Sequence, residues 1–398
     1  MALSDEFLIH LLDDSRDQTD SAAGTGIMSE QDLDWSKIRD IVLRHRVESS
    51  FLNVLHNAAV EPPEEIGLTL EERVRETSLR NLEYSRQLHE LSDLFNEYDI
   101  TALPFKGPVL AEIAYDSVSD RCFDDLDFLV HSEDIQKACQ LLEEEGYKRI
   151  NFPGISVETL IDGTVFRWGK ELRFVNPDNG VPVELRFGFI GGERSDLDII
   201  SEFWERRTVV SVAGETLPVL SPEDRALLVL VHGTKHGWRR LSWVSDTVSI
   251  VQQDIDWETV MTRAKKYRWR NATIYGLAVV KQLADVTVPD PVKSEIESNR
   301  LCLWGAQRTA TCIQKHPEDK LEYLEPIATA LYLNDQLSGA VAEGINELFA
   351  PRKADYELIK LPQPLHPVYT LIRMYRVGRT KLRGLIDLCK PTELIDRI

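Results

Sequence analysis

Residues 123–130 read FDDLDFLV, a short run in which acidic residues interrupt an otherwise apolar strand pattern. Side chains along a β-strand alternate between two faces, so Asp125 and Asp127 share one face, while Leu126, Phe128 and Val130 share the other. Two carboxylates roughly 6 Å apart repel each other by about 3 kcal/mol at an effective dielectric of about 20. Such a pair is stable in solvent or when cations bind between the two groups, and the rest of the chain distinguishes these cases.

Composition and charge limit the classes of partner. The 398 residues carry a formal net charge of -20, which repels nucleic-acid phosphate and makes nucleic acid a less favoured partner. No apolar run is long enough to span a bilayer, and the acidic N-terminus lacks the basic start of a signal peptide. We therefore expect no membrane association. The five cysteines form no C-x-x-C pair, which favours a reducing, cytoplasmic location: Cys122, Cys139, Cys302, Cys312 and Cys389.

Hydrophobic periodicity divides the chain into three regions. Residues 1–99 show helical spacing, and the capping-box pattern TLEE at 69–72 predicts a helix start. Residues 100–215 change to a mixture of strands and helices and form the expected catalytic core. Residues 216–398 return to helical spacing and form the expected C-terminal helical domain. A polar Gly- and Ser-containing segment at 17–32 predicts a loose connection.

The core region predicts an α+β fold. Strands are expected at 100–105, 123–130, 164–175 and 181–190, and helices at 108–115 and 133–145. The sequence NPDNG at 176–180 predicts a hairpin turn between the last two strands. We therefore expect a mixed β-sheet with helices on one face, flanked by N-terminal and C-terminal helical regions.

Glu184 supplies a third acid, on a strand that we expect to lie beside the one carrying Asp125 and Asp127. Three carboxylates on one sheet face suit metal-assisted phosphoryl transfer, because Mg²⁺ or Mn²⁺ prefers carboxylate oxygens and bridges substrate phosphates. Two such ions can clamp the attacking and leaving oxygens of an in-line displacement. Asp125, Asp127 and Glu184 are therefore the predicted catalytic and metal-binding residues, with an NTP as substrate. Glu184 is also expected to help take the proton from the acceptor hydroxyl.

A Lys-Gly pair precedes the helix predicted at 108–115. Gly107 has no side chain, so the backbone can approach a phosphate at the helix N-terminus. The chain has 16 lysines against 30 arginines, and Lys106 is the only lysine between Lys37 and Lys137. Because the chain uses lysine sparingly, a lysine at this position indicates a need for a compact positive charge. We expect Lys106 to lie at the surface and to bind the leaving pyrophosphate.

These features together resemble the DNA polymerase β-like nucleotidyltransferase superfamily and, within it, the bacterial and archaeal family usually called uncharacterised nucleotidyltransferases. That family combines a Lys-Gly, an Arg-Pro-x-x-Asp-x-Asp strand, an acidic-Leu-His-Trp strand and a helix with His-x-x-x-His-x-Trp. The matching residues here are Lys106-Gly107, Arg121 with Asp125 and Asp127, Glu184-Leu185, and His232, His236 and Trp238. The resemblance runs from about residue 35 to the C-terminus. It implies that Arg121 and His236 join Lys106 and Gly107 in binding the nucleotide.

The chain departs from the family pattern at two places. Cys122 stands where the family usually has proline, and Arg186-Phe187 stands where it has His-Trp. The second departure leaves the acid at Glu184 in place but removes the usual histidine. It keeps open the alternative of a nucleotide-binding or regulatory module that has lost turnover.

Other interpretations of the same residues compete with these. His232 and His236 could bind zinc with Asp246, although histidines in a Trp-rich helix are more often packing residues. Lys235, with the arginines at 239 and 240, could neutralise a triphosphate or could form a solvated helix face. The tryptophans at 238, 243 and 257 are most simply core.

The leading function is thus a Mg²⁺-dependent nucleotidyltransferase that moves a nucleoside monophosphate from an NTP to an acceptor. A D-x-D glycosyltransferase is disfavoured, because that motif usually ends a strand in a polar loop, whereas here FLV follows at once. A small molecule or a protein is the favoured acceptor.

Overall fold

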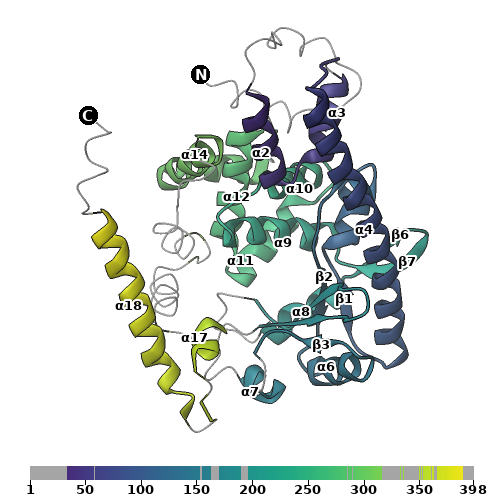
Figure 1. Cartoon of the computed structure of the whole chain (residues 1–398), viewed down its shortest axis with the longest axis vertical. Helices are drawn as coiled ribbons and strands as arrows, with labels where there is room; N and C mark the ends of the chain where they lie inside the picture. Colours follow the sequence, from purple (N-terminus) through teal and green to yellow (C-terminus); the bar gives the residue numbers. More distant parts are fainter. Residues whose placement is uncertain are drawn as a thin grey trace.

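The computed structural model describes residues 34–388, apart from 58, 153–154, 163–169, 190–195, 285, 289, 316–331, 333–334, 336–348, 350, 352, 360 and 363–364. The loop expected at 17–32 and the first half of the strand expected at 164–175 lie outside the described residues. Figure 1 shows one long N-terminal helix running beside a small sheet, with a group of shorter helices beyond it.

In the described part of the chain, the helices before the sheet are α2 (Trp35–His45), α3 (Glu48–Asn57) and α4 (Glu64–Glu97). The helix start predicted at Thr69 is wrong, because α4 begins at Glu64, directly after Pro63. Thr69 lies inside the helix, and its hydroxyl donates to the backbone carbonyl of Glu65 at 2.8 Å. Proline ends the preceding extended segment, and the acidic residues that follow it complement the positive end of the helix dipole.

The main sheet has five strands: β1 (Ala102–Pro104), β2 (Leu126–Val130), β3 (Lys148–Arg149), β4 (Glu171–Val175) and β5 (Pro182–Arg186). Their order is β1-β2-β5-β4-β3, with β2 and β5 parallel and the other neighbours antiparallel. The prediction of an α+β fold with a mixed sheet is confirmed. Strand β2 begins at Leu126 rather than at residue 123, so Asp125 stands just before it.

The hairpin predicted at 176–180 joins β4 to β5. The Gly180 backbone N–H donates to the Asn176 carbonyl at 2.8 Å, and Gly180 has a φ of +72°, a conformation that glycine adopts without strain. The resulting register places Arg173 opposite Glu184. The hairpin therefore brings a cation beside the third acid.

The two faces of the sheet pack against different helices. Phe128 and Leu185 belong to one apolar cluster with residues of α4 and of α6 (Ile135–Glu144). Leu129, on the opposite face of β2, belongs to a second cluster with the C-terminal helices. Asp127 alternates with Phe128 and therefore points to the same side as Leu129. The acidic face of the sheet is thus the one that the C-terminal helices cover.

The remaining elements of the core region are α5 (Gly107–Ala114), η2 (Val118–Asp120), α7 (Val157–Asp162), α8 (Asp196–Glu205), β6 (Thr208–Val212) and β7 (Glu215–Val219). The predicted change to helix at residue 216 falls inside the β6–β7 hairpin, and the helical part begins at Pro222. Ala213 and Gly214 both have positive φ, as a tight hairpin turn requires. Whether 99 and 215 bound separate domains stays a prediction.

The C-terminal region is helical: α9 (Pro222–Lys235), α10 (Leu241–Val251), α11 (Trp257–Tyr267), α12 (Arg270–Leu283), α13 (Asp290–Ser298), α14 (Arg300–Lys315), α17 (Lys353–Leu358) and α18 (Val368–Leu388). Trp238 and Trp257 are buried, which confirms them as core residues, whereas Trp243 is only partly buried and packs against the same cluster. In Figure 1 α18 forms the left edge of the view, away from the sheet. No helix in the described part of the chain is long and apolar enough to cross a membrane.

His45 links the N-terminal helices to α10 and makes stability depend on pH. Its Nδ1 accepts the Leu241 backbone N–H at 3.2 Å, and burial, with Arg44 and Arg240, lowers its pKa from 6.5 to about 4. Below pH 6.5 the unfolded chain therefore binds more protons than the folded chain. We expect this histidine alone to remove about 3 kcal/mol of the free energy of unfolding as the pH falls through that window.

The variant His45→Asn tests this expectation, because asparagine keeps a hydrogen-bond acceptor and cannot titrate. Urea unfolding of both proteins at several pH values between 4 and 7 should show a smaller acid loss for the variant. Parallel stability curves would show that His45 does not titrate in this way. Other buried histidines also have lowered pKa values, so only the difference between the wild-type and His45→Asn stability curves measures the contribution of His45.

Candidate active site

Strand register brings two of the three predicted acids together. Asp127 on β2 is the direct partner of Glu184 on the parallel strand β5, so the two side chains lie next to each other on one face. Both are buried, with 5% and 3% of their surface exposed. Asp125 stands two residues before Asp127, at the entrance of the strand. β5 is thus the neighbour of β2, as expected from the sequence.

Asp125 shows the electrostatic effect of this crowding. Burial, and then the charge of Asp127, raises its pKa from 3.8 to about 7, while Lys106 acts in the opposite direction and Glu184 raises it further. A cation bound here would relieve the repulsion among the three acids.

Lys106 lies across from this group, between β1 and α5. Its Nζ lies 3.2 Å from Asp127 Oδ1, and the backbone N–H of Phe105 donates to the Asp127 carbonyl at 3.3 Å. Only 15% of the Lys106 side chain is exposed, so the expected surface position is wrong. The antiparallel pairing of β1 with β2 carries the lysine onto the acidic face, where the carboxylate holds it.

Gly107 begins α5 in a conformation that only glycine adopts easily, with a φ of +50°. A Cβ at this position would lie 3.1 Å from the backbone carbonyl oxygen of Asp125. The absent side chain thus lets the turn pack directly against the strand that carries the acids.

Two arginines hold Glu184. Arg186, on the same strand face, forms an ion pair with Glu184 and another with Glu171 at 2.8 Å, and Arg173 Nη2 lies 3.1 Å from Glu184 Oε2. Burial raises the pKa of Glu184, but Arg186, Lys106 and Arg173 outweigh it and bring the pKa to about 2. Arg186, which replaces the usual histidine, therefore keeps this acid fully ionised.

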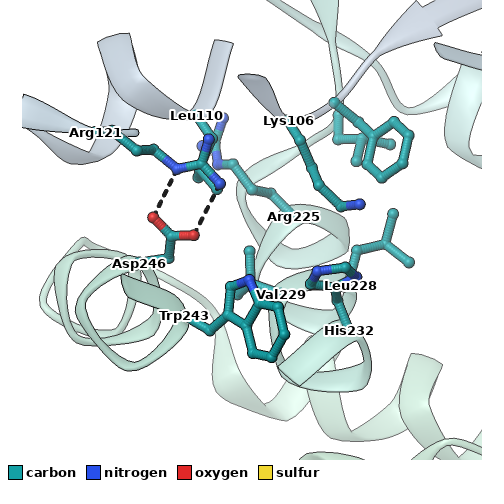
Figure 2. A pocket seen from close by; sticks show the side chains of 11 residues that line it. Lys106, Leu110, Arg121, Arg225, Leu228, Val229, His232, Trp243 and Asp246 are labelled. Carbon is teal, nitrogen blue, oxygen red and sulfur yellow. Dashed lines mark hydrogen bonds and ion pairs between the residues drawn. The ribbon is translucent and has the colours of Figure 1, made fainter. Parts of the chain in front are cut away.

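Arg121 is buried and faces α10. Its guanidinium makes a two-point contact with Asp246, Nε to Oδ1 at 2.7 Å and Nη2 to Oδ2 at 2.9 Å, as Figure 2 shows. Tyr115 also donates to Asp246 at 2.8 Å, and Arg121 Nη1 lies 3.4 Å from the Gly107 carbonyl. In this arrangement Arg121 positions the Lys-Gly turn against α10. Its contact with a nucleotide stays a prediction.

The histidines of α9 pack around an indole. The ring centroids of His232 and His236 lie 4.6 Å apart. The Trp243 ring centroid lies 5.5 Å from that of His232 and 5.3 Å from that of His236. Burial, followed by Lys235 and Lys106, lowers the pKa of His236 to about 3, so it is neutral. The prediction that His236 contacts the nucleotide remains untested.

The zinc alternative is wrong, because Asp246 is engaged by Arg121 instead of facing the histidines. Within the described residues, no group of three or more His, Cys, Asp or Glu side chains could hold a metal ion as placed. In the acidic group, Lys106 pairs with Asp127, and Arg186 and Arg173 pair with Glu184. Metal binding by the carboxylates therefore stays a prediction, and it requires these cations to give way.

A cleft of about 470 Å³, including its opening to solvent, adjoins the acidic face and is lined by Phe105, Lys106, Arg186, Phe189, Leu228, Val231, His232 and Lys235. Burial and the charge of Arg186 lower the pKa of Lys235 to about 8. Lys235 therefore joins Lys106 and Arg186 instead of the arginines at 239 and 240 with which the sequence grouped it. Three cations, Lys106, Arg186 and Lys235, thus face this cleft.

The family model for uncharacterised nucleotidyltransferases matches residues 31–285, which is more than half of the chain. The chain belongs to this family. The matched span includes the five-stranded sheet, the Lys-Gly turn and helices α9 to α12, so the candidate site lies entirely within the family region.

A solved structure gives a distant comparison. The crystal structure of an antigenic nucleotidyltransferase-like protein from Paracoccidioides brasiliensis is similar at 14% identity over 46% of this chain and 87% of its own, with a TM-score of 0.29. No curated protein matches the chain.

Several contacts of the candidate site were not predicted from the sequence. The pairing of Glu184 with Arg186 could have been predicted, because residues two apart on a strand share a face. The pairing with Arg173 follows from the predicted hairpin. The contact of Arg121 with Asp246 had no local signal, because the two residues are 125 positions apart.

Proposed function

We propose that this nucleotidyltransferase is a Mg²⁺-dependent enzyme that moves a nucleoside monophosphate from an NTP to an acceptor hydroxyl or similar group. The observation that supports it is the pairing of Asp127 and Glu184 on adjacent parallel strands, with Asp125 before them and Lys106 opposite. In the reaction the acceptor oxygen bonds to the α-phosphorus, the bond to pyrophosphate breaks in line, and the acceptor loses its proton.

Asp125, Asp127 and Glu184 are the residues that would hold the divalent ions. The donor set fits hard cations, which take carboxylate oxygens, and burial together with the charge of Asp127 disfavours the ionised form of Asp125 unless a cation binds there. Two bound Mg²⁺ or Mn²⁺ ions would neutralise the attacking and leaving oxygens. Lys106, Lys235 and Arg186 would bind the triphosphate, and Gly107 would let its phosphates approach the backbone.

Glu184 suits the role of ligand better than that of base. A carboxylate with a pKa of about 2 accepts a proton poorly near neutral pH. Because Arg186 keeps Glu184 ionised, Glu184 would help to hold a divalent ion beside Asp127 and would not take the acceptor's proton.

Removal of the Lys106 side chain should weaken nucleotide binding. We expect Lys106→Ala to cost about 1.5–3 kcal/mol of NTP binding free energy, the range for a hydrogen bond to a charged group. Calorimetric titration with a non-hydrolysable NTP and Mg²⁺ measures it. The variant should also lose some stability, because Asp127 loses its cation beside two other acids. Unchanged NTP affinity together with lower stability would show that Lys106 is only structural.

Mass spectrometry of candidate acceptors tests the transfer itself. Small metabolites and proteins are incubated with each NTP and Mg²⁺, with and without chelator, and adducts are sought at the mass of a nucleoside monophosphate. The expected result is an adduct and equimolar pyrophosphate, both absent with chelator. Nucleic acid serves as a third acceptor class, which the acidic surface disfavours.

A second candidate function is a nucleotide-binding or regulatory module without turnover. The observation that favours it is the neutralisation of Glu184 by Arg186 and Arg173. In that case calorimetry would show NTP binding, while no acceptor gains mass and no pyrophosphate appears.

A further inference from the structure

Four charged side chains form a square on the β4–β5 hairpin: Glu171, Arg173, Glu184 and Arg186. Glu171 is the direct cross-strand partner of Arg186, and Arg173 is that of Glu184. Residues two apart on a strand share a face, so all four side chains lie on the face that carries Asp127, the neighbour of Glu184 on β2. Charges alternate around the square, and each arginine therefore lies between two acids.

Each arginine of this square contacts both acids. Arg173 Nη2 lies 3.0 Å from Glu171 Oε1 and 3.1 Å from Glu184 Oε2. Arg186 Nη2 lies 2.8 Å from Glu171 Oε2 and also pairs with Glu184. Both arginines thus already have a second carboxylate. If Glu184 turns to another cation, neither arginine loses its counter-charge.

Glu171 lies away from the proposed metal site but close to the cleft. It stands on β4, which β5 separates from the strand of Asp127, and its side chain is 24% exposed, whereas Glu184 is buried. Burial and Arg186 lower the pKa of Lys235, while Glu171 raises it, so Glu171 acts on the cations of the cleft. Glu171 can therefore hold the arginines without occupying the metal site.

We propose that Glu171 is a positioning residue that keeps Arg186 and Arg173 when a divalent ion binds Glu184. The ion pairs between the arginines and Glu184 break, those with Glu171 remain, and Glu184 turns to the metal. Arg186 stays at the cleft, where it can contact a phosphate. This role rests on the proposed metal-dependent transfer, in which Glu184 must be a ligand although two arginines already hold it.

Loss of the Glu171 charge should change metal and anion binding in opposite directions. Both guanidinium groups would then rely on Glu184 alone, and because an unpaired buried charge is costly they would compete more strongly with a metal ion. The surroundings of the cleft would also gain one unit of positive charge, beside Arg186 and Lys235. Metal binding should weaken, while binding of a metal-free polyphosphate should strengthen.

Two titrations test this role. Mn²⁺ alone is followed by the electron paramagnetic resonance of the free ion, and inorganic tripolyphosphate with chelator is followed by calorimetry. The proteins are the wild type, Glu171→Gln, Arg173→Gln and the variant with both substitutions. Glu202→Gln is the matched control, because Glu202 is 23% exposed and also pairs with two cations, Arg206 and Lys266. Urea unfolding shows that each protein is folded.

Glu171→Gln should bind Mn²⁺ about 10–100 times more weakly, the range for loss of an outer partner of a metal ligand. It should bind tripolyphosphate about two to five times more tightly, the effect of one partly exposed charge pair. Arg173→Gln should bind Mn²⁺ about two to five times more tightly, because one competitor of the metal is gone. The double variant should recover most of the Mn²⁺ affinity that Glu171→Gln loses. Glu202→Gln should match the wild type in both titrations.

Wild-type Mn²⁺ affinity of Glu171→Gln would overturn this role, as would weaker Mn²⁺ binding by Arg173→Gln or no recovery in the double variant. Weaker binding of both Mn²⁺ and tripolyphosphate by Glu171→Gln would show that Glu171 only supports the sheet. If Glu171→Gln does not fold, the sign of the change in Arg173→Gln decides. A wild type that binds no Mn²⁺ would overturn both this role and the proposed metal dependence. A wild type that shows these shifts but forms no adduct would keep the role of Glu171 and lose the proposed transfer.

Discussion

Replacement of Asp127 by asparagine is expected to lower nucleotidyl transfer by at least about a hundredfold, since even an outer partner of a metal ligand costs up to that factor. Asparagine keeps the shape of the side chain and removes the charge that would hold a divalent ion. Stability should change little. The Lys106 ion pair is lost, but Asp125 and Glu184 are relieved of a neighbouring negative charge. Pyrophosphate release measures the transfer activity, and urea unfolding of the same variant measures its stability, so a loss of activity can be told apart from a loss of folding.

Asp124→Asn is the matched control for this variant. Asp124 precedes the same strand, but its half-exposed side chain pairs with Arg46 and, at 3.7 Å, with Arg80. It should retain most of the transfer activity, because these arginines hold it away from the acidic group. Equal loss of activity in the two variants, or full activity of Asp127→Asn, would remove Asp127 from the catalytic group.

The buried pair of Arg121 and Asp246 should give the largest change in stability. Asp246→Asn leaves the Arg121 guanidinium buried without a counter-charge, which typically costs about 3–5 kcal/mol. Burial opposes the charged form of Arg121, and Asp246 is the charge that raises its pKa again. Urea unfolding measures the loss. Transfer should fall as well, because Arg121 also contacts the carbonyl of Gly107.

A double-mutant cycle separates this pair from general disruption. Arg121→Met combined with Asp246→Asn should recover much of the stability that Asp246→Asn loses, since no buried charge then remains and asparagine can still accept from Tyr115. The exposed pair of Arg73 and Glu76 serves as control, where Arg73→Met should cost under about 1 kcal/mol. Additive losses for Arg121→Met and Asp246→Asn would show that the two residues do not act as a pair.

The sequence alone determined the local geometry of the site. Period two in residues 123–130 predicted a strand with Asp127 on the face opposite Phe128, and the turn at 176–180 specified the β4–β5 hairpin. The Lys-Gly pair predicted a turn at a helix start, and α5 does begin at Gly107. These features depend on neighbouring residues, whose spacing the chain fixes directly.

The tertiary structure decided which charges meet. Lys106 was expected near the surface, but the β1–β2 register places it on Asp127, and the crossing of α10 brings Asp246 to Arg121. Lys235 was grouped with neighbouring arginines, yet α9 carries it to the cleft beside Arg186. Each pairing joins segments far apart in the chain. Strand register and helix packing are set by the burial of whole apolar faces, so no local spacing could have specified them.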